Sequence, residues 1–114
     1  MTGDRMRRVD EAVREVLSVA ITKQLKDPRV GFVTVTAVET APDLRRARVF
    51  VSVLGDTGVR KRSMQGLRSA HGILQRAVAH ELRLKHTPTL EFLYDDTSER
   101  GMRIAELIDR EAER

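Results

Sequence analysis

The side chains best suited to chemistry in this 114-residue chain are Lys and Arg, and they gather in one stretch. Between Gly58 and Lys85 the sequence holds seven Lys or Arg residues and a single acid, Glu81. Guanidinium and ammonium groups in such density bind phosphate, so the stretch predicts contact with a polyanion such as nucleic acid. The seven candidate residues are Arg60, Lys61, Arg62, Arg68, Arg76, Arg83 and Lys85.

Charge is also unevenly spread over the whole chain. Residues 1–88 hold 17 Lys/Arg and 9 Asp/Glu, a balance of +8, whereas residues 89–114 hold 4 and 8, a balance of −4. Arg5 and Arg8 fall in the first turns of a predicted helix, where the helix dipole disfavours positive charge, so we add both to the candidate phosphate contacts. An ordinary solvated surface remains the alternative, because a third of the residues are charged.

Catalytic and metal-binding patterns are weak. His71, His80 and His86 lack a metal-ligand spacing such as an i, i+4 pair, and there is no cysteine for a thiolate site, a nucleophile or a disulfide. The adjacent Asp95 and Asp96 suit a turn and a helix cap better than acid–base catalysis. We therefore expect no catalytic residue, metal, cofactor or small-molecule substrate.

Periodicity predicts the elements that must position these residues. We expect helices over residues 5–26, 63–85 and 101–108, and strands over 32–40, 46–54 and 90–94. Asp4 is the predicted N-cap of the first helix, and Asp96 with Glu99 forms a capping-box pattern before the last. All of these belong to one domain, residues 1–114, with residues 1–4 and 110–114 expected to fray.

The two strands before residue 55 read as an antiparallel hairpin. In the first strand, Val33, Val35 and Ala37 alternate with threonines and should share one side. Phe32 and Phe50 are expected to be strand residues packed in the core. That placement leaves few aromatics for base stacking, so the sequence favours recognition of RNA shape and phosphate.

A glycine stands in the middle of the predicted helix over 63–85. Gly72 costs about 1 kcal/mol relative to alanine at such a position, so we expect a kink, a close backbone approach or a ligand contact around Ala70-His71-Gly72. A tolerated packing glycine is the alternative, because the apolar stripe continues through it. His71 could hydrogen-bond a phosphate or a base, or face solvent, and we expect it to face solvent.

The order helix–strand–strand–helix–kink–helix–strand resembles a type II KH domain: an α+β fold whose three-stranded sheet has helices packed on one face, here followed by a C-terminal helix. Over nearly its whole length the sequence resembles the bacterial ribosome-binding factor A family. The motifs that carry this resemblance are Arg8-Val9, Asp27-Pro28-Arg29, Asp43-Leu44, Ala47-Arg48-Val49, Ala70-His71-Gly72, Arg83, Pro88-x-Leu90-x-Phe92 and Asp95. In that family an Ala-x-Gly kink replaces the Gly-x-x-Gly loop of ordinary KH domains, and Ala70-His71-Gly72 fits it.

The resemblance implies a non-catalytic assembly factor that binds the immature small (30S) ribosomal subunit and contacts its 16S rRNA near the decoding region. Such factors support late maturation, including processing of the 5′ end and growth in the cold. No apolar run suggests a signal peptide or a membrane span, so we expect a cytoplasmic protein without a membrane partner. We also expect a monomer, because nothing in the sequence demands a dimer.

Three other functions stay open. A stand-alone KH protein that regulates mRNA or small RNA would want the intact Gly-x-x-Gly loop that this chain lacks. A protein–protein adaptor would use the acidic terminal helix and bind regardless of salt. An enzyme would use Asp95 or His71, around which no coherent site is visible.

Overall fold

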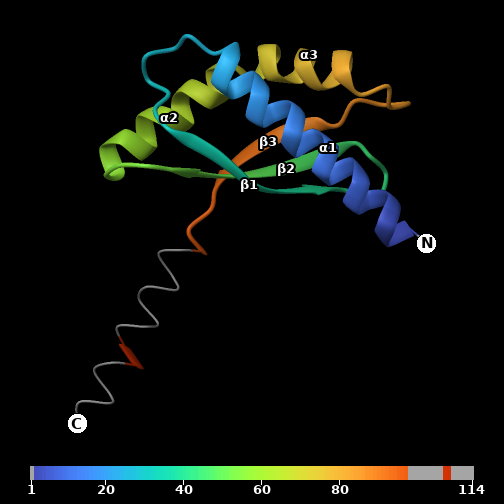
Figure 1. Cartoon of the computed structure of the whole chain (residues 1–114), viewed down its shortest axis with the longest axis horizontal. Helices are drawn as coiled ribbons and strands as arrows, with labels where there is room; N and C mark the ends of the chain where they lie inside the picture. The colour runs from blue at the N-terminus through green and yellow to red at the C-terminus, as the bar shows by residue number, and fades with distance from the viewer. Residues whose placement is uncertain (1, 98–106, 109–114) are drawn as a thin grey trace.

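Figure 1 shows the computed structural model of the chain, which describes residues 2–97 and 107–108. Within residues 2–97, the helices α1, α2 and α3 lie on the same side of a three-stranded sheet. The elements follow one another as α1 (Thr2–Lys23), β1 (Val33–Thr40), β2 (Arg46–Val53), α2 (Thr57–Ser69), α3 (His71–Glu81) and β3 (Thr89–Tyr94). This order confirms the predicted KH type II-like α+β fold. The helix expected over 101–108 and its capping residue Glu99 lie outside the described residues, except for Leu107 and Ile108, which are helical.

The central strand, β2, pairs antiparallel with β1 and parallel with β3. A parallel pair needs a long crossover connection, and the crossover here contains both α2 and α3. The alternation predicted for β2 is confirmed, because the four residues that share its inner side are all buried. They are Ala47, Val49, Val51 and Val53.

Strand β1 departs from the predicted alternation at a β-bulge. The register with β2 shifts between Val35 and Ala37, where Thr36 is the extra residue. Beyond the bulge, Val38 is buried and Ala37 only half-buried. The prediction that Ala37 shares the inner side with Val35 is therefore wrong.

Helix α1 is shifted toward the N-terminus relative to the prediction. Asp4 is not the N-cap; it lies inside the helix, and its Oδ1 accepts a hydrogen bond of 2.8 Å from the Arg7 guanidinium. The helix ends at Lys23, three residues before the predicted end at Lys26. Leaving the helix early lets Leu25 pack, half-buried, against the core.

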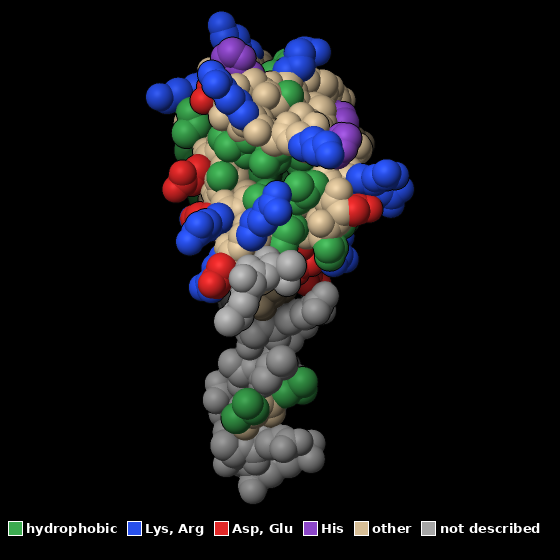
Figure 2. Space-filling view, turned by 90° about the vertical axis from the view of Figure 1, so that its right-hand side faces the viewer, with side chains coloured by type: hydrophobic (Ala, Val, Ile, Leu, Met, Phe, Trp, Pro, Cys, Tyr) green, Lys and Arg blue, Asp and Glu red, His purple; other side chains and the backbone are tan. Residues whose placement is uncertain are grey.

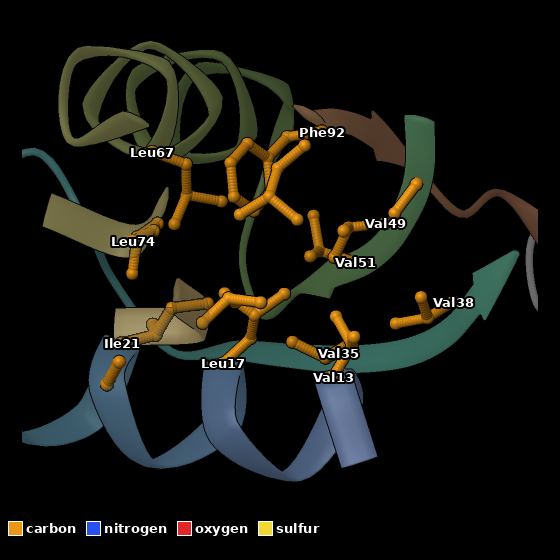
Figure 3. Close-up of a cluster of buried hydrophobic side chains, with 14 of the residues drawn as sticks. Val13, Leu17, Ile21, Val35, Val38, Val49, Val51, Leu67, Leu74 and Phe92 are labelled. Atoms are coloured by element: carbon orange, nitrogen blue, oxygen red, sulfur yellow. The ribbon is translucent and has the colours of Figure 1, made fainter. Parts of the chain in front are cut away.

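The core lies between the helices and the inner face of the sheet and is almost wholly aliphatic (Figure 3). Leu17 of α1, Leu67 of α2 and Leu74 of α3 are fully buried and meet the valines of β2 there. Phe92 of β3 is the one aromatic residue among the buried core residues described. Burial of this apolar surface is the main force that fixes the helices on the sheet. None of the helices in the described ranges is long and apolar enough to traverse a lipid bilayer.

Candidate nucleic-acid interface

The predicted bend is centred on Ala70, where two helices meet. Ala70 has φ −87° and ψ 10°, and its N–H donates to the carbonyls of Gly66 at 3.0 Å and Leu67 at 3.1 Å. Its side chain is buried in the core. The kink expected at Ala70-His71-Gly72 thus lies at its first residue, before Gly72.

The boundaries of this helix pair differ from the single helix predicted over 63–85. α2 begins already at Thr57, because the Asp56 carboxylate accepts a hydrogen bond of 2.9 Å from the Val59 N–H and caps the helix. α3 ends at Glu81, because Leu82 is extended. Arg83 and Lys85 consequently lie in the connection to β3 and not on a helix.

The glycine that close packing requires is Gly66 and not Gly72. A Cβ on Gly66 would lie 2.5 Å from Val30 Cγ2, whereas a Cβ on Gly72 would meet only the Arg76 guanidinium at 3.6 Å. Three residues before Gly66, the buried Ser63 accepts a hydrogen bond from the Gly31 N–H at 3.1 Å. Small residues on this side of α2 therefore let the segment 27–31 pack against the helix.

That segment has an internal ion pair of its own. The Asp27 carboxylate accepts hydrogen bonds from the guanidinium of Arg29 at 2.6 Å and from the Arg29 backbone N–H at 2.9 Å. These interactions lower the pKa of Asp27 to about 2, with the Arg29 side chain as the larger cause. Arg29 is thereby engaged within its own turn.

Polar side chains of the helix pair cover the free edge of β3. Gln75 donates to the Pro88 carbonyl at 2.6 Å and accepts from the Leu90 N–H at 3.1 Å. His71 Nε2 donates to the Leu90 carbonyl at 3.1 Å, and the Arg68 guanidinium donates to the Phe92 carbonyl at 3.3 Å. An edge strand satisfied in this way is a poor template for another strand. The expectation that His71 faces solvent is wrong, since its half-buried ring is held against β3.

Of α1, α2 and α3, only α2 contains Lys and Arg without an acid. Four of the 13 residues of α2 are Lys or Arg, and none is acidic. Lys61 and Arg62 are exposed, and neither forms an ion pair within the described ranges. Arg60 is half-buried, and its guanidinium lies 4.4 Å from the centre of the Tyr94 ring, a cation–π contact.

The candidate cations at the other end of the molecule lie among acids. In Figure 1 the start of α1 and the end of α3 lie opposite the first turns of α2, and Figure 2 looks onto that end, where Lys and Arg alternate with Asp and Glu. Arg5 and Lys85 share a shallow pocket with Asp43. Arg8 lines a second one with acidic residues of α1, Asp4 and Glu11.

Arg76 occupies a third environment, a groove of about 530 Å³ between α1 and α3. The apolar lining of this groove includes the exposed Val19 and Ile73. Acids of both helices, Glu15 and Glu81, line the groove as well. The nine cations predicted from the sequence therefore do not share one surface. Lys61, Arg62 and, on the next turns of α2, Arg68 form the one group without an acid on its own helix.

Phe32 is the residue whose placement differs most from the prediction. The expectation that it packs in the core is wrong, because 80% of its surface is exposed. Phe32 lies just before β1, and Leu54 lies just beyond β2. The Leu54 N–H donates a hydrogen bond of 3.0 Å to the Phe32 carbonyl. Phe50, the other aromatic expected in the core, is half-buried, with the Arg48 guanidinium 6.0 Å from its ring centre.

The residues of the enzyme alternative have structural partners. The Asp95 carboxylate accepts hydrogen bonds from the Thr36 hydroxyl at 2.6 Å and from the Thr97 N–H at 2.9 Å, which agrees with its predicted place in a turn. Within the part of the chain that the structure describes, no group of three or more His, Asp or Glu side chains is placed to hold a metal ion.

This three-helix, three-stranded arrangement with a helix–kink–helix crossover is a KH-like domain. The crystal structure of ribosome-binding factor A from Thermus thermophilus is similar, with a TM-score of 0.69 and 27% identity over 78% of this chain and 94% of that one. A homology model of the Thermus thermophilus factor, fitted into a cryo-EM map of its complex with the 30S subunit, has a TM-score of 0.62 and 30% identity, covering 75% of this chain and 90% of that one.

Sequence relatives agree with the structural ones. Residues 5–108 match the family model described as "Ribosome-binding factor A". Ribosome-binding factor A from Halothermothrix orenii is 43% identical over 96% of this chain and 90% of its own length, and that from Anaeromyxobacter sp. strain K is 50% identical over 97% and 80%. The chain belongs to the ribosome-binding factor A family, as the sequence motifs predicted.

Proposed function

We propose that this protein binds the immature small (30S) ribosomal subunit through its 16S rRNA and supports late maturation, including processing of the 5′ end of that rRNA. It acts in the cytoplasm as a monomer and contributes binding energy without catalysing a reaction. The observation that carries the proposal is that helix α2 contains no acid, while Lys61 and Arg62 on it are exposed and form no ion pair within the described residues. Membership of a family with a 30S-bound member supports the choice of partner.

In this proposal the cations neutralise rRNA phosphates to different extents. Lys61 and Arg62 are exposed on a helix that contains no acid, so these cations of α2 contribute most. Cations next to acids contribute less, because part of their field is already neutralised. The proposed contacts, with α2 first, are Arg60, Lys61, Arg62, Arg68, Arg76, Arg83, Lys85, Arg5 and Arg8.

The kink takes part through its open backbone. Gly72 is exposed and has open space around it apart from the Arg76 guanidinium, so an RNA strand can approach the first turn of α3 closely. Ala70 sets the bend, and His71 stabilises it by bonding to β3. The protein binds an rRNA conformation that exists only before maturation, and it leaves when that conformation disappears.

The test compares two matched double charge reversals. Lys61→Glu with Arg62→Glu changes the exposed cations of α2, and Arg5→Glu with Arg8→Glu changes the end of the molecule where cations lie among acids by the same charge. We expect the α2 variant to bind immature 30S subunits at least 100-fold more weakly and to lower the slope of log affinity against log salt by about 2, one for each lost phosphate contact. The control variant should lose about tenfold or less. Co-sedimentation at several salt concentrations measures both quantities.

Cells that carry the α2 variant in place of the native protein should accumulate 16S rRNA with an unprocessed 5′ end, which primer extension measures. Affinity of the wild type that does not change with salt, or equal losses in the two variants, would contradict the proposed interface. Wild-type protein that ignores subunits but binds free mRNA would favour the stand-alone regulator.

A further inference from the structure

We propose that the outer face of the sheet is the docking site for the C-terminal segment of the same chain, residues 97–108. The outer face is the one opposite α1, α2 and α3, and none of these three helices covers it (Figure 1). The inference goes beyond the proposed function, because it concerns a contact within the protein and does not depend on the partner of α2.

The outer face carries two rows of apolar side chains. The strand register places Ala37, Phe50 and Leu93 side by side on β1, β2 and β3, and all three are half-buried. Leu54 shares this face with Phe50, because side chains four residues apart along a strand point the same way. Phe32 is hydrogen-bonded to Leu54 through the backbone, and the two are 80% and 76% exposed. A contiguous apolar patch of this kind usually marks a binding site.

The chain leaves β3 over this same face. Tyr94, the last residue of β3, packs against the core on the helix side, so the next residue, Asp95, points to the outer face. The Asp95 carboxylate accepts a hydrogen bond of 2.6 Å from the hydroxyl of Thr36 on β1. Because β2 lies between β1 and β3, this bond passes over the outer side of β2. The C-terminal segment therefore begins between the two apolar rows.

The C-terminal segment has an apolar face of its own. Leu107 and Ile108 are helical and are 59% and 62% exposed. On a helix, Ile104 would adjoin both, since it precedes them by three and four residues. Leu107 follows Thr97 by ten residues, which a helix spans in about 15 Å. This is shorter than the eight residues of β2, at about 3.3 Å each, so a segment that turns back after Asp95 reaches the apolar rows.

Charge and proximity favour this occupant over an RNA strand or a second copy. The outer face carries three acids and two cations, which are Glu39, Glu91, Asp95, Arg46 and Arg48. Arg48 is already paired with Glu39 at 2.7 Å, so the face does not attract RNA phosphates. A short tether gives the segment an effective concentration in about the millimolar range, against which a second copy at micromolar concentration competes poorly.

Cysteine crosslinking tests the contact directly, because the chain contains no cysteine. The test variant is Leu54→Cys with Leu107→Cys. The matched control is Ile73→Cys with Leu107→Cys, since Ile73 is 41% exposed in the groove between α1 and α3, on the helix side of the sheet. In dilute protein under mild oxidation, we expect the intramolecular disulfide to form at least roughly tenfold faster in the test variant than in the control. Non-reducing electrophoresis measures both rates.

Tryptophan fluorescence gives a second readout, because the chain contains no Trp either. In Phe32→Trp the docked segment shields the new indole from water. Adding Leu107→Asp and Ile108→Asp removes the apolar face of the segment, so we expect the emission to shift to longer wavelength. The control is Val19→Trp, at an exposed position on α1, whose emission should not respond to the same two substitutions. Circular dichroism should be unchanged, because all the replaced side chains are exposed.

The possible results separate this contact from its alternatives. If the two cysteine pairs crosslink at the same rate, or if the emission of Phe32→Trp does not respond to the two aspartates, the docking site is refuted. Disulfides that form mainly between chains, and more often as the protein concentration rises, would identify a second copy as the occupant and also refute it. Binding to 30S subunits is measured separately on α2, so the proposed function stands or falls independently of these results.

Discussion

The two helices that meet at Ala70 are similar in length but are held to the rest of the molecule in different ways. α2 packs through small residues: Ser63 and Gly66 lie directly against the segment 27–31. α3 is attached through longer polar side chains, with His71 and Gln75 hydrogen-bonded to the edge of β3. The contact of α2 with the segment 27–31 therefore depends on close packing beside one hydrogen bond, whereas the polar contact of α3 with β3 consists of individual hydrogen bonds.

The two helices also differ in the charges around their exposed cations. On α2, Ser63 and Gly66 lie on the face that meets the segment 27–31, whereas Lys61 and Arg62 are exposed on a helix without acids. On α3, Arg76 shares the groove beside α1 with Glu15 and Glu81. An Arg on α3 therefore has acids near it that an exposed Arg on α2 does not have on its own helix. The density of Lys and Arg along the sequence does not distinguish these two environments.

The largest effect on stability should come from replacing a glycine with alanine on each helix in turn, at Gly66 of α2 and at Gly72 of α3. Gly66→Ala places a methyl 2.5 Å from Val30 Cγ2, and the branched valine cannot move away freely. Overpacking outweighs the gain in helix propensity, so we expect a loss of about 2 kcal/mol in the free energy of unfolding and a fall of roughly 10 °C in Tm. Gly72→Ala has ordinary contact distances and should stabilise the fold by about 0.5 kcal/mol. Thermal unfolding followed by circular dichroism measures both.

Gly72→Ala has a second use. If RNA approaches the backbone of α3 as proposed, this variant should bind subunits more weakly although it is more stable. Equal stability changes in the two glycine variants would show that the contact between Gly66 and Val30 does not constrain α2.

A smaller effect should separate the polar contacts of the two helices. Gln75→Ala leaves the N–H of the buried Leu90 without its partner, so we expect a loss of about 1–2 kcal/mol and faster hydrogen exchange at Leu90. Ser63→Ala should cost less than about 1 kcal/mol, because its donor, Gly31, is exposed and can bond to water instead. Denaturant unfolding compares the two variants. A larger loss for Ser63→Ala would reverse the view that hydrogen bonds matter more on α3.

Much of the fold was predictable because the core is encoded by simple alternation. Inward-facing valines every second residue define β2, and the apolar stripe of α1 marks the side that meets the sheet. The break at Ala70 could not be located this way, since Leu67, Ala70 and Leu74 continue one apolar stripe through it. Only a local change in ψ separates the two helices, and hydrophobic spacing does not record ψ.

The candidate site was predictable by residue type but not by arrangement. Charge density along the sequence predicts residues 60–62 as phosphate contacts, but it could not show that Arg5 and Lys85 lie at the opposite end. Phe32 was misplaced because it is apolar and adjoins a strand, although it lies one residue beyond the end of β1. Gly66 was missed, although a usable signal exists: Ser63 and Gly66, three residues apart, put two small residues on one helix face.

The smallest effect is a shift in the titration of Asp27, which lies beside α2. Its folded-state pKa is lowered from 3.8 to about 2, so the stability that it contributes is fully present above about pH 4 and is lost as the pH falls through 2. In Arg29→Gln the guanidinium is gone while the backbone N–H still donates, and the pKa should therefore return only part of the way toward 3.8. NMR titration of the carboxyl carbon measures this, and an unchanged midpoint would remove Arg29 as the cause.

The same carboxyl reports on the packing of α2. A Cβ on Gly66 would lie 3.6 Å from the Asp27 Cγ, whereas Gly72 has no neighbour in the segment 27–31. The 3.6 Å distance is an ordinary contact, but the 2.5 Å clash with Val30 should push the segment 27–31 away from α2. Gly66→Ala should in this way disturb the Asp27–Arg29 pair and raise the midpoint, and Gly72→Ala should leave it at the wild-type value. If both glycine variants titrate like the wild type, the segment 27–31 adjusts to the added methyl without loosening its ion pair. The segment then moves relative to α2 and is not held rigidly against Gly66.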